Sequence, residues 1–514
     1  MKTDTIIVET SYGPVRGIKR TSAVGDQFFS FRGIPYAKPP IGELRFKDPQ
    51  LPDSWTHPID ATEAGHAAPA LNMFTKGVVG NENCLILNVY TREYGDGSEM
   101  IYGPDYLLSK DIVYVSMNYR LGVLGFLSIE DPSAQVPGNA GIKDQSMALQ
   151  WVRKNIHAFG GNSKNITVFG ESAGAGSVHL HMLSDLSKGL FDKAIVQSGS
   201  ALASWCNNPN KNWAERVAKK LGWDGVGGAT ELVNFLRKVD VEKLILAQEF
   251  RTDEEKRDWV FSEWGPCVEP YVSEQCLLDR SPSDMLKTAW SNGIPLIIGG
   301  TTEEGLLMYR DVTADPELYK GEKAYENLIP KEWNLSEEKT KTLAENLKSV
   351  YIEGGCPTKN EMQKFLDIIS DKLFWHGMHS AVLGRLQVNA APTYLYRFAF
   401  SADAKSNHIR QFLVPSEVKG VCHGEDIASI FKFSMNKEPT INGAEHRAID
   451  RMTSLFTRFA TTGNPNCDIT KHCEWKSIPN RSSPPFKCLN IDDELSFIFY
   501  PESRRIALWD SMRP

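Results

Sequence analysis

The feature that most constrains the fold is the segment Gly170-Glu171-Ser172-Ala173-Gly174. Apolar residues at 165–169 predict a short strand directly before it, and residues 173–184 predict a helix directly after it. A strand that turns at once into a helix leaves space only for small residues, which the glycines provide. This arrangement is typical of a nucleophilic serine, Ser172, held on a sharp turn at a helix N-terminus. A glycine-rich packing turn is the alternative interpretation.

Strands and helices alternate along much of the chain. Short apolar runs predict strands at 5–9, 14–18, 84–91, 111–118, 165–169, 192–198, 294–300 and 393–400. Apolar residues spaced three and four apart predict helices at 144–159 and 173–184, mostly helical segments at 211–290 and 320–390, and a helix around Ile449, Met452, Phe456 and Phe459. Such alternation indicates an α/β fold with a mostly parallel central sheet flanked by helices. No linker, charge block or repeat divides the chain, so we expect a single domain over residues 1–514.

The composition is that of an ordinary globular protein and argues against several classes of function. The 57 Lys and Arg residues are outnumbered by 64 Asp and Glu residues, which gives a net charge of −7. Nucleic-acid binding proteins usually carry a basic excess, so we expect no nucleic-acid partner. The most apolar run, residues 294–298, is far shorter than the roughly 20 residues that cross a bilayer, so we expect no membrane span.

The cysteines favour a reducing compartment. There are nine, an odd number, and they are scattered without a Cys-x-x-Cys pair, which argues against a zinc module or a disulfide framework. Cys467, His472 and Cys473 share a short loop, where a metal site is the alternative to a plain surface loop. The apolar run at residues 6–8 is too short for a signal peptide. We therefore expect a cytoplasmic protein that holds neither a metal nor another cofactor.

A serine nucleophile requires a base, and the base requires an acid that orients it. Folds with this strand–turn–helix arrangement place both later in the chain, with the acid before the histidine. Glu303 and Glu304 follow the predicted strand at 294–300. His423 follows the predicted strand at 393–400, in a loop flanked by glycines. Because open α/β sheets build their sites at strand exits, His423 is the strongest candidate base.

The other paired histidines are weaker candidates. His179 and His181 are two residues apart on a predicted helix and cannot share a face. His376 and His379 can share a helical face, so a metal pair is an alternative to two ordinary helix histidines.

Longer segments carry a resemblance to a known family. They surround the turn at Ser172 and lie at residues 28–37, 82–90, 118–122, 138–145 and 197–200. With them, nearly the whole chain resembles the type-B carboxylesterases, the carboxylesterase/cholinesterase family of α/β-hydrolases, and is most similar to the intracellular α-esterases of insects. The resemblance implies an α/β-hydrolase fold and the hydrolysis of small to medium carboxylic esters, foreign compounds included.

The resemblance also implies roles for individual residues. Ser172 corresponds to the nucleophile and His423 to the general base. Glu304, which immediately precedes a glycine, corresponds to the orienting acid. The N–H group of Ala173 corresponds to one donor of the oxyanion hole.

Two buried ion pairs are implied by the resemblance as well, Arg32 with Glu82 and Arg120 with Asp144. Their expected role is structural, because removing one partner would leave an uncompensated buried charge at a cost of about 3–5 kcal/mol.

Differences from two subfamilies indicate a general esterase. Glu171 precedes the serine, where juvenile hormone esterases carry glutamine. Residues 71–76 lack the tryptophan with which cholinesterases hold choline. Residues 60–75 contain no cysteine that could pair with Cys84 in the early disulfide of the family.

The segment after Tyr90 departs from the family pattern. The resemblance predicts a strand and a run of glycines there, whereas residues 91–93 pass directly into 94–102, which resemble the segment after the glycines. About 15 residues are therefore missing, roughly one strand of 6 residues and its loops. The strand order of the family places this strand between those at 111–118 and 165–169. We expect a sheet that lacks one central strand, and that either closes up or is filled by another segment.

The same departure removes glycines that belong to the oxyanion hole. Their N–H groups would meet the charge of the tetrahedral intermediate, and losing one such donor costs about 10²–10³ in rate. Ala173 remains as a donor, whereas Gly95 and Gly97 are weak substitutes because they lie in a polar stretch of low strand propensity. We therefore expect an ester hydrolase with impaired turnover. The alternatives are a non-catalytic esterase-like binding protein, against which the retained triad argues, and a stoichiometric scavenger of organophosphates.

Overall fold

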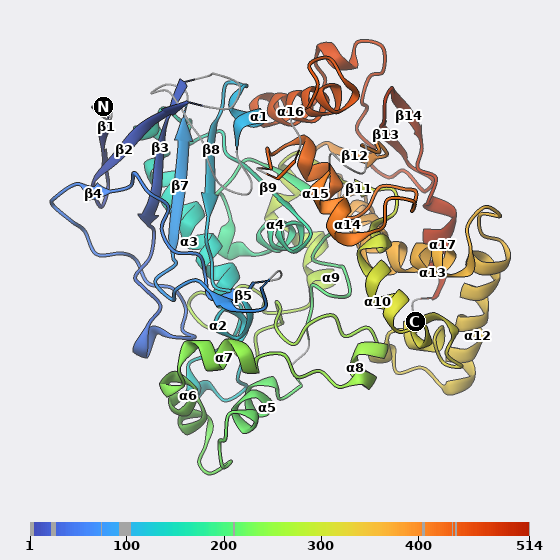
Figure 1. Ribbon diagram of the computed structural model, residues 1–514, viewed down its shortest axis with the longest axis horizontal. Helices are drawn as coiled ribbons and strands as arrows, with labels where there is room; N and C mark the ends of the chain where they lie inside the picture. The colour runs from blue at the N-terminus through green and yellow to red at the C-terminus, as the bar shows by residue number, and fades with distance from the viewer. Residues whose placement is uncertain are drawn as a thin grey trace.

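Figure 1 shows two groups of strands with helices packed around them. The computed structural model describes residues 5–21, 27–72, 75–91, 104–208, 211–402, 407–433, 435–436 and 439–512. Within these residues, most strands belong to two six-stranded sheets, which lie next to each other in Figure 1.

The N-terminal sheet is largely antiparallel. Its strand order is β1-β2-β3-β7-β8, with β4 added parallel to β2. The strand bounds are β1 Thr5–Thr10, β2 Gly13–Thr21, β3 Gln27–Pro35, β4 Ile59–Asp60, β7 Ile86–Thr91 and β8 Val113–Met117, while β5 Ala70–Leu71 and β6 Val78–Val79 pair separately. The sequence predicted β1, β2, β7 and β8. It missed β3, whose pairing with β7 shifts register between Phe31 and Ile34 and so breaks the regular alternation.

The second sheet contains the parallel strands. Its order is β14-β13-β12-β11-β10-β9, parallel from β9 to β13 and antiparallel between β13 and β14. The bounds are β9 Thr167–Glu171, β10 Lys193–Gln197, β11 Leu296–Thr301, β12 Thr393–Phe398, β13 Lys487–Ile491 and β14 Leu495–Phe499. The sequence predicted β9 to β12 and missed β13 and β14. β10 and β11 are buried along their whole length, as strands covered on both faces should be.

Helices cover both sheets, and those with a predicted apolar face bury it. The bounds are α1 Asp105–Leu108, α2 Gly122–Phe126, α3 Ala140–Asn155, α4 Ala173–Leu183, α5 Trp213–Lys220, α6 Ala229–Lys238, α7 Val241–Ala247, α8 Asp253–Arg257, α9 Pro282–Met285, α10 Tyr309–Ala314, α11 Glu317–Lys320, α12 Glu337–Leu347, α13 Glu361–Ser370, α14 His376–Gln387, α15 His408–Leu413, α16 Ala444–Thr462 and α17 Ser503–Met512. α3 packs on the N-terminal sheet, α4 on β9 and β10, and the predicted face of α16 on β12. The prediction that 211–290 is mostly helical is wrong for residues 258–281, which are irregular and include Pro266 and Pro270.

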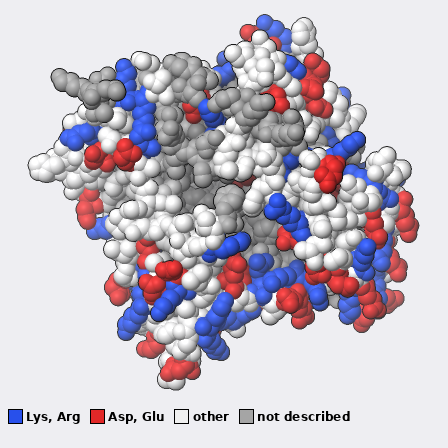
Figure 2. All heavy atoms as spheres, viewed as in Figure 1, with Lys and Arg blue, Asp and Glu red and all other residues white. Residues whose placement is uncertain are grey.

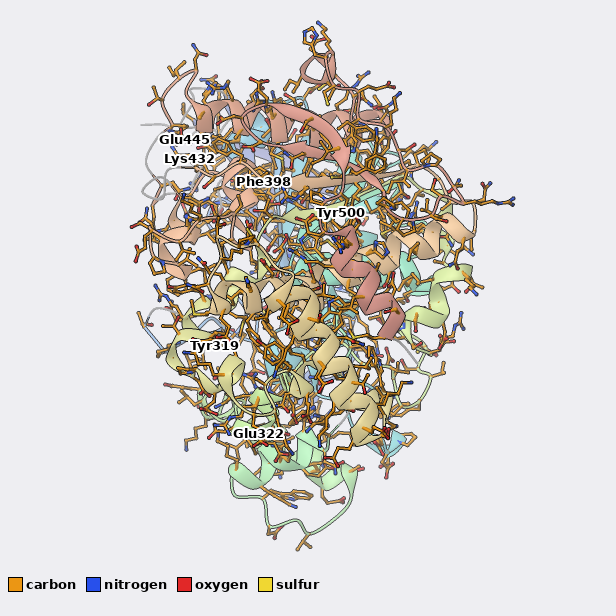
Figure 3. The ribbon with its side chains drawn as sticks, turned by 90° about the vertical axis from the view of Figure 1, so that its right-hand side faces the viewer. Tyr319, Glu322, Phe398, Lys432, Glu445 and Tyr500 are labelled. Atoms are coloured by element: carbon orange, nitrogen blue, oxygen red, sulfur yellow. The ribbon has the colours of Figure 1, made fainter. Side chains whose placement is uncertain are left out.

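The core is shared between strands and C-terminal helices. Phe398 on β12 and Tyr500 just before α17 are 1% and 2% exposed, and Figure 3 shows Tyr500 beside the start of that helix. The centre of the Tyr500 ring lies 5.0 Å from the centre of the Trp375 ring. On the outside, charged side chains of both signs are interspersed over the lower and right-hand parts of the face in Figure 2. Among the described helices, none has the length and apolar composition needed to cross a bilayer.

The two sheets meet at β8 and β9 without pairing there. Within the described residues, β8 pairs with β7 and β9 pairs with β10, so the first of the two expected outcomes, closure of the sheet by direct pairing, does not occur among them. All residues of both strands are half-buried. Three aromatic rings make contact across the junction instead. The ring centre of Tyr114 on β8 lies 6.3 Å from that of Phe169 on β9. The ring centre of Phe431 lies 5.7 Å from that of Tyr114 and 6.0 Å from that of Phe169.

The predicted pair of Arg120 and Asp144 is present and fully buried. Nε and Nη2 of Arg120 donate to the two carboxylate oxygens at 2.8 and 2.6 Å, and Nη1 donates to the carbonyl of Lys47 at 2.7 Å. The pair therefore fastens the start of α3 to the loops that precede α2.

The predicted pair of Arg32 and Glu82 is wrong. Nη2 of Arg32 instead contacts Glu63 at 3.2 Å and donates to the Thr62 carbonyl at 2.7 Å. Glu82 accepts two hydrogen bonds from Arg45, at 2.7 and 2.5 Å. Arg45 also donates to backbone carbonyls at the end of α6, so its guanidinium is held beside Glu82 from two sides.

Replacing Asp144 with alanine should lower the free energy of unfolding by about 3–5 kcal/mol, because Arg120 would keep a buried charge without its partner. The matched control is Asp450→Ala, which breaks a surface pair with Lys110 and should cost less than about 1 kcal/mol. Urea unfolding followed by tryptophan fluorescence measures both. Equal losses in the two variants would contradict the structural role of the Arg120 pair.

Candidate active site

Ser172 occupies the turn between β9 and α4. Its φ of 57° and ψ of −119° lie in a region that non-glycine residues rarely adopt, at a typical cost of about 1–3 kcal/mol. The turn is held because Ser172 N donates to the Gln197 carbonyl at 2.9 Å. A Cβ at Gly170 would lie 2.6 Å from the backbone of Gly174, which confirms the predicted need for small residues. The sequence missed Gly199, where a Cβ would lie 2.9 Å from the Ser172 carbonyl.

The three predicted triad residues meet. A parallel bridge between Glu303 and Cys422 places the next residues, Glu304 and His423, side by side. His423 Nδ1 lies 2.6 Å from Glu304 Oε2. On the other side of the ring, His423 Nε2 lies 2.8 Å from Ser172 Oγ. A proton can therefore pass from the serine to the imidazole while the carboxylate holds the ring.

Glu304 is fully buried, and its second oxygen is also satisfied. Glu304 Oε1 accepts hydrogen bonds from Ser198 Oγ at 2.6 Å and from Thr301 N at 2.7 Å. Glu303 points elsewhere and accepts from Val421 N at 3.0 Å. The geometry thus favours Glu304 over Glu303 as the orienting acid.

Carboxylates surround His423. Glu171 Oε1 lies 3.1 Å from His423 Nε2, without hydrogen-bond geometry. Asp426 is close enough for its charge to raise the pKa of His423, and it accepts hydrogen bonds from Gln197 and Tyr396. Burial alone would lower the pKa of His423, but the negative charges of Glu171 and Glu304 outweigh it and raise the pKa from 6.5 to about 9. Burial raises the pKa of Glu171, which the charge of His423 partly offsets.

The N-terminus of α4 carries the N–H group of Ala173, which the sequence predicts as an oxyanion donor. Within the described residues, Ala173 N donates to no acceptor, as expected for the first position of a helix. Ala173 is exposed, and a Cβ at Gly174 would meet open space. Gly95 and Gly97 lie outside the described residues.

The remaining histidine candidates have structural partners. His181 contacts Ser187 and Gln145, and burial lowers its pKa to about 3. His179 accepts a hydrogen bond from Ala201 N at 3.1 Å. His376 and His379 do share a face, where both contact Asp510 of α17 at 3.0 and 3.2 Å.

The described residues contain no group of three or more potential ligands that could hold a metal ion, and this includes the loop with Cys467, His472 and Cys473.

Two residues of the site were missed by sequence reasoning. Ser198 lies in the segment 197–200, but its spacing of 106 residues from Glu304 carries no periodic signal. Phe374, whose ring centre lies 4.5 Å from that of His423, comes from a π-helical turn, Asp371–Trp375. Such turns are enriched at functional sites, but the sequence pattern here is that of an ordinary buried helix.

The comparisons with known proteins agree with this geometry. A model of the carboxylesterase family matches residues 4–509. The chain belongs to the carboxylesterase family. Esterase B1 of Culex pipiens is 38% identical over 534 residues, which covers 100% of this chain and 99% of that protein. Juvenile hormone esterase of Tribolium castaneum is 32% identical over 523 residues, with coverage of 92% and 86%.

A solved structure shares the fold. The crystal structure of juvenile hormone esterase from Manduca sexta, with OTFP covalently attached, matches with a TM-score of 0.84 at 27% identity, covering 99% of each chain. The protein is therefore a carboxylic ester hydrolase of the serine carboxylesterase family with an α/β-hydrolase fold, as the sequence predicted.

The raised pKa of His423 predicts an alkaline pH profile. Because the neutral imidazole is the base, kcat/KM for an aryl acetate should rise with pH well above 6.5, toward about 9. Glu171→Gln removes a negative charge 3.1 Å from Nε2, so the rise should move to lower pH. The matched control is Glu417→Gln, an exposed charge outside the site, which should leave the profile in place. A profile of Glu171→Gln that coincides with the wild type would contradict the charge effect.

Proposed function

We propose that the esterase cleaves carboxylic esters by acyl transfer to Ser172. The observation that carries this proposal is the continuous line of contacts from Ser172 Oγ to His423 Nε2 at 2.8 Å and from His423 Nδ1 to Glu304 at 2.6 Å. His423 takes the serine proton as Oγ bonds to the ester carbonyl carbon. The same proton then passes to the alcohol oxygen as the carbon–oxygen ester bond breaks.

Deacylation repeats these steps with water. His423 takes a proton from water as its oxygen bonds to the acyl carbon, and returns the proton to Ser172 Oγ as the acid leaves. Glu304 accepts the hydrogen bond from His423 Nδ1 and holds the imidazolium in place. Its burial and its contacts with Ser198 and Thr301 support this role, because they leave it one orientation.

We further propose that turnover is impaired because the oxyanion hole is incomplete. Oxyanion stabilisation depends on several preplaced donors in a water-excluded site. Among the described residues, the structure offers the Ala173 N–H, and Ala173 is exposed.

Two observations support the loss of a segment. The alignment with Esterase B1 spans 534 positions against 514 residues here, so that relative has at least 20 residues without a counterpart. Within the described residues, β8 has no partner beyond β7 and β9 has none beyond β10, and the strand that the family pattern predicts would fit between them.

Pure protein should hydrolyse a generic aryl acetate about 10²–10³ times more slowly than Esterase B1, which is the typical cost of one lost oxyanion donor. Ser172→Ala should abolish the measured rate, whereas Ser283→Ala, an exposed serine on α9, should leave it unchanged. A kcat within tenfold of the relative would contradict the incomplete oxyanion hole. Activity that survives in Ser172→Ala would contradict the nucleophile.

A second candidate function is stoichiometric scavenging of organophosphates, because nucleophile and base are aligned even if turnover is slow. Exposure to a phosphoryl fluoride should add one phosphoryl group to Ser172, with loss of fluoride, and no adduct should form in Ser172→Ala. Intact-mass spectrometry and peptide mapping measure this. A wild-type protein that stays unmodified would end this candidate.

A single domain and a cytoplasmic location are also proposed. All nine cysteines are free thiols, which supports a reducing compartment. The family match over residues 4–509 supports one continuous unit.

A further inference from the structure

The loop that carries His423 has few regular contacts of its own. It runs from Val418 to Glu425 and includes Gly420 and Gly424, whose φ values of 105° and 79° fit glycine alone at little cost. One isolated bridge, between Glu303 and Cys422, joins it to the strand exit after β11. Val421 N also donates to Glu303 Oε2 at 3.0 Å and to Thr302 Oγ1 at 3.1 Å, so the middle of the loop is held at the strand exit. Because catalytic side chains must be held within roughly 0.5 Å, the two ends of the loop need support as well.

Arg410 of α15 provides that support. Its side chain is 4% exposed, and Nη1 donates to the Gly420 carbonyl at 2.5 Å and to Glu425 Oε1 at 2.8 Å. Nη2 donates to the Val418 carbonyl. The guanidinium of one arginine therefore binds both ends of the loop, at Val418 and at Glu425.

Glu425 links Arg410 to the backbone next to the catalytic histidine. The same oxygen, Oε1, accepts a hydrogen bond from Cys422 N at 2.7 Å, and Cys422 directly precedes His423. Glu425 is 1% exposed, and its Oε2 has no hydrogen-bond partner among the described residues. A buried pair with an unsatisfied oxygen adds little net stability, so its position beside His423 is the better reason for its presence.

The helix that carries Arg410 contacts both halves of the site. α15 packs against the turn Glu304–Met308, which begins with the orienting acid, and against the turn Glu425–Ser429, which follows the histidine. Asn407 caps α15 by accepting from Arg410 N at 3.3 Å and donates to the Glu425 carbonyl at 3.3 Å.

We propose that Arg410 and Glu425 are positioning residues that hold His423 in line with Ser172 and Glu304. Neither residue is among the hydrogen-bond partners of Ser172, and they act through the backbone of residues 418–422. This inference rests on the proposed triad, in which His423 is the base.

The test uses two readouts on the full chain. The first is the rate of Ser172 modification by a phosphoryl fluoride, measured by intact mass. The second is the downfield proton resonance of His423 Nδ1–H, which a short hydrogen bond to Glu304 produces and which His423→Ala assigns. Arg410→Lys keeps the positive charge but loses the planar guanidinium with its several N–H donors. It should slow the modification of Ser172 about 10²-fold and remove or shift the Nδ1–H resonance.

Two further variants make the result specific. Arg397→Lys weakens a comparable pair with Glu502 outside the triad, at 2.9 Å, and should leave rate and resonance near wild type. If Arg410→Lys does not fold, Glu425→Gln decides by the same readouts. It keeps an oxygen for Cys422 N, so its rate should lie between those of wild type and Glu425→Ala.

The proposal is overturned if folded Arg410→Lys, or Glu425→Gln in its place, retains the wild-type rate and resonance. It is also overturned if Arg397→Lys loses as much. A wild-type protein that the phosphoryl fluoride does not label refutes the proposed function instead. The resonance then still decides whether Arg410 positions His423.

Discussion

The hydrogen bond between Glu304 and His423 is the interaction on which the site depends. A carboxylate with no exposed surface is costly unless each oxygen is satisfied. Glu304 meets this demand with Ser198, Thr301 N and His423, which come from the exits of β10 and β11 and from a loop more than 100 residues later. These partners meet because β9, β10, β11 and β12 are parallel and paired in register, which brings their carboxyl ends to one edge of the sheet. The strand pairing that builds the sheet therefore also assembles the triad.

Negative charge is concentrated around one imidazole. Glu304 lies at Nδ1, Glu171 lies near Nε2, and the fully buried Asp426 adds a third charge that acts on the ring. Each carboxylate favours the imidazolium, which is the state formed as Ser172 attacks. Negative charge on these carboxylates also lowers the fraction of neutral imidazole, so the arrangement stabilises the protonated intermediate but leaves less of the free base.

The triad is held by more hydrogen bonds than the proposed oxyanion donor. Ser172, His423 and Glu304 are held by hydrogen bonds from several elements. Ala173 is exposed, and its N–H donates to no acceptor among the described residues. It follows β9, at the junction of the two sheets, where aromatic contacts replace backbone pairing among the described residues. Acyl transfer needs both halves, because attack without charge stabilisation leaves the tetrahedral intermediate high in energy.

Local sequence determined the turn at Ser172, strands β9 to β12 and the apolar face of α16, because steric limits and side-chain periodicity act over a few residues. It also placed His423 and Glu304 at strand exits. Tertiary structure alone decided that Arg45 rather than Arg32 meets Glu82, that Ser198 holds Glu304, and that Arg410 braces the histidine loop. Such long-range partners are chosen by packing and register among many candidates of equal chemistry, and no spacing within the chain records that choice.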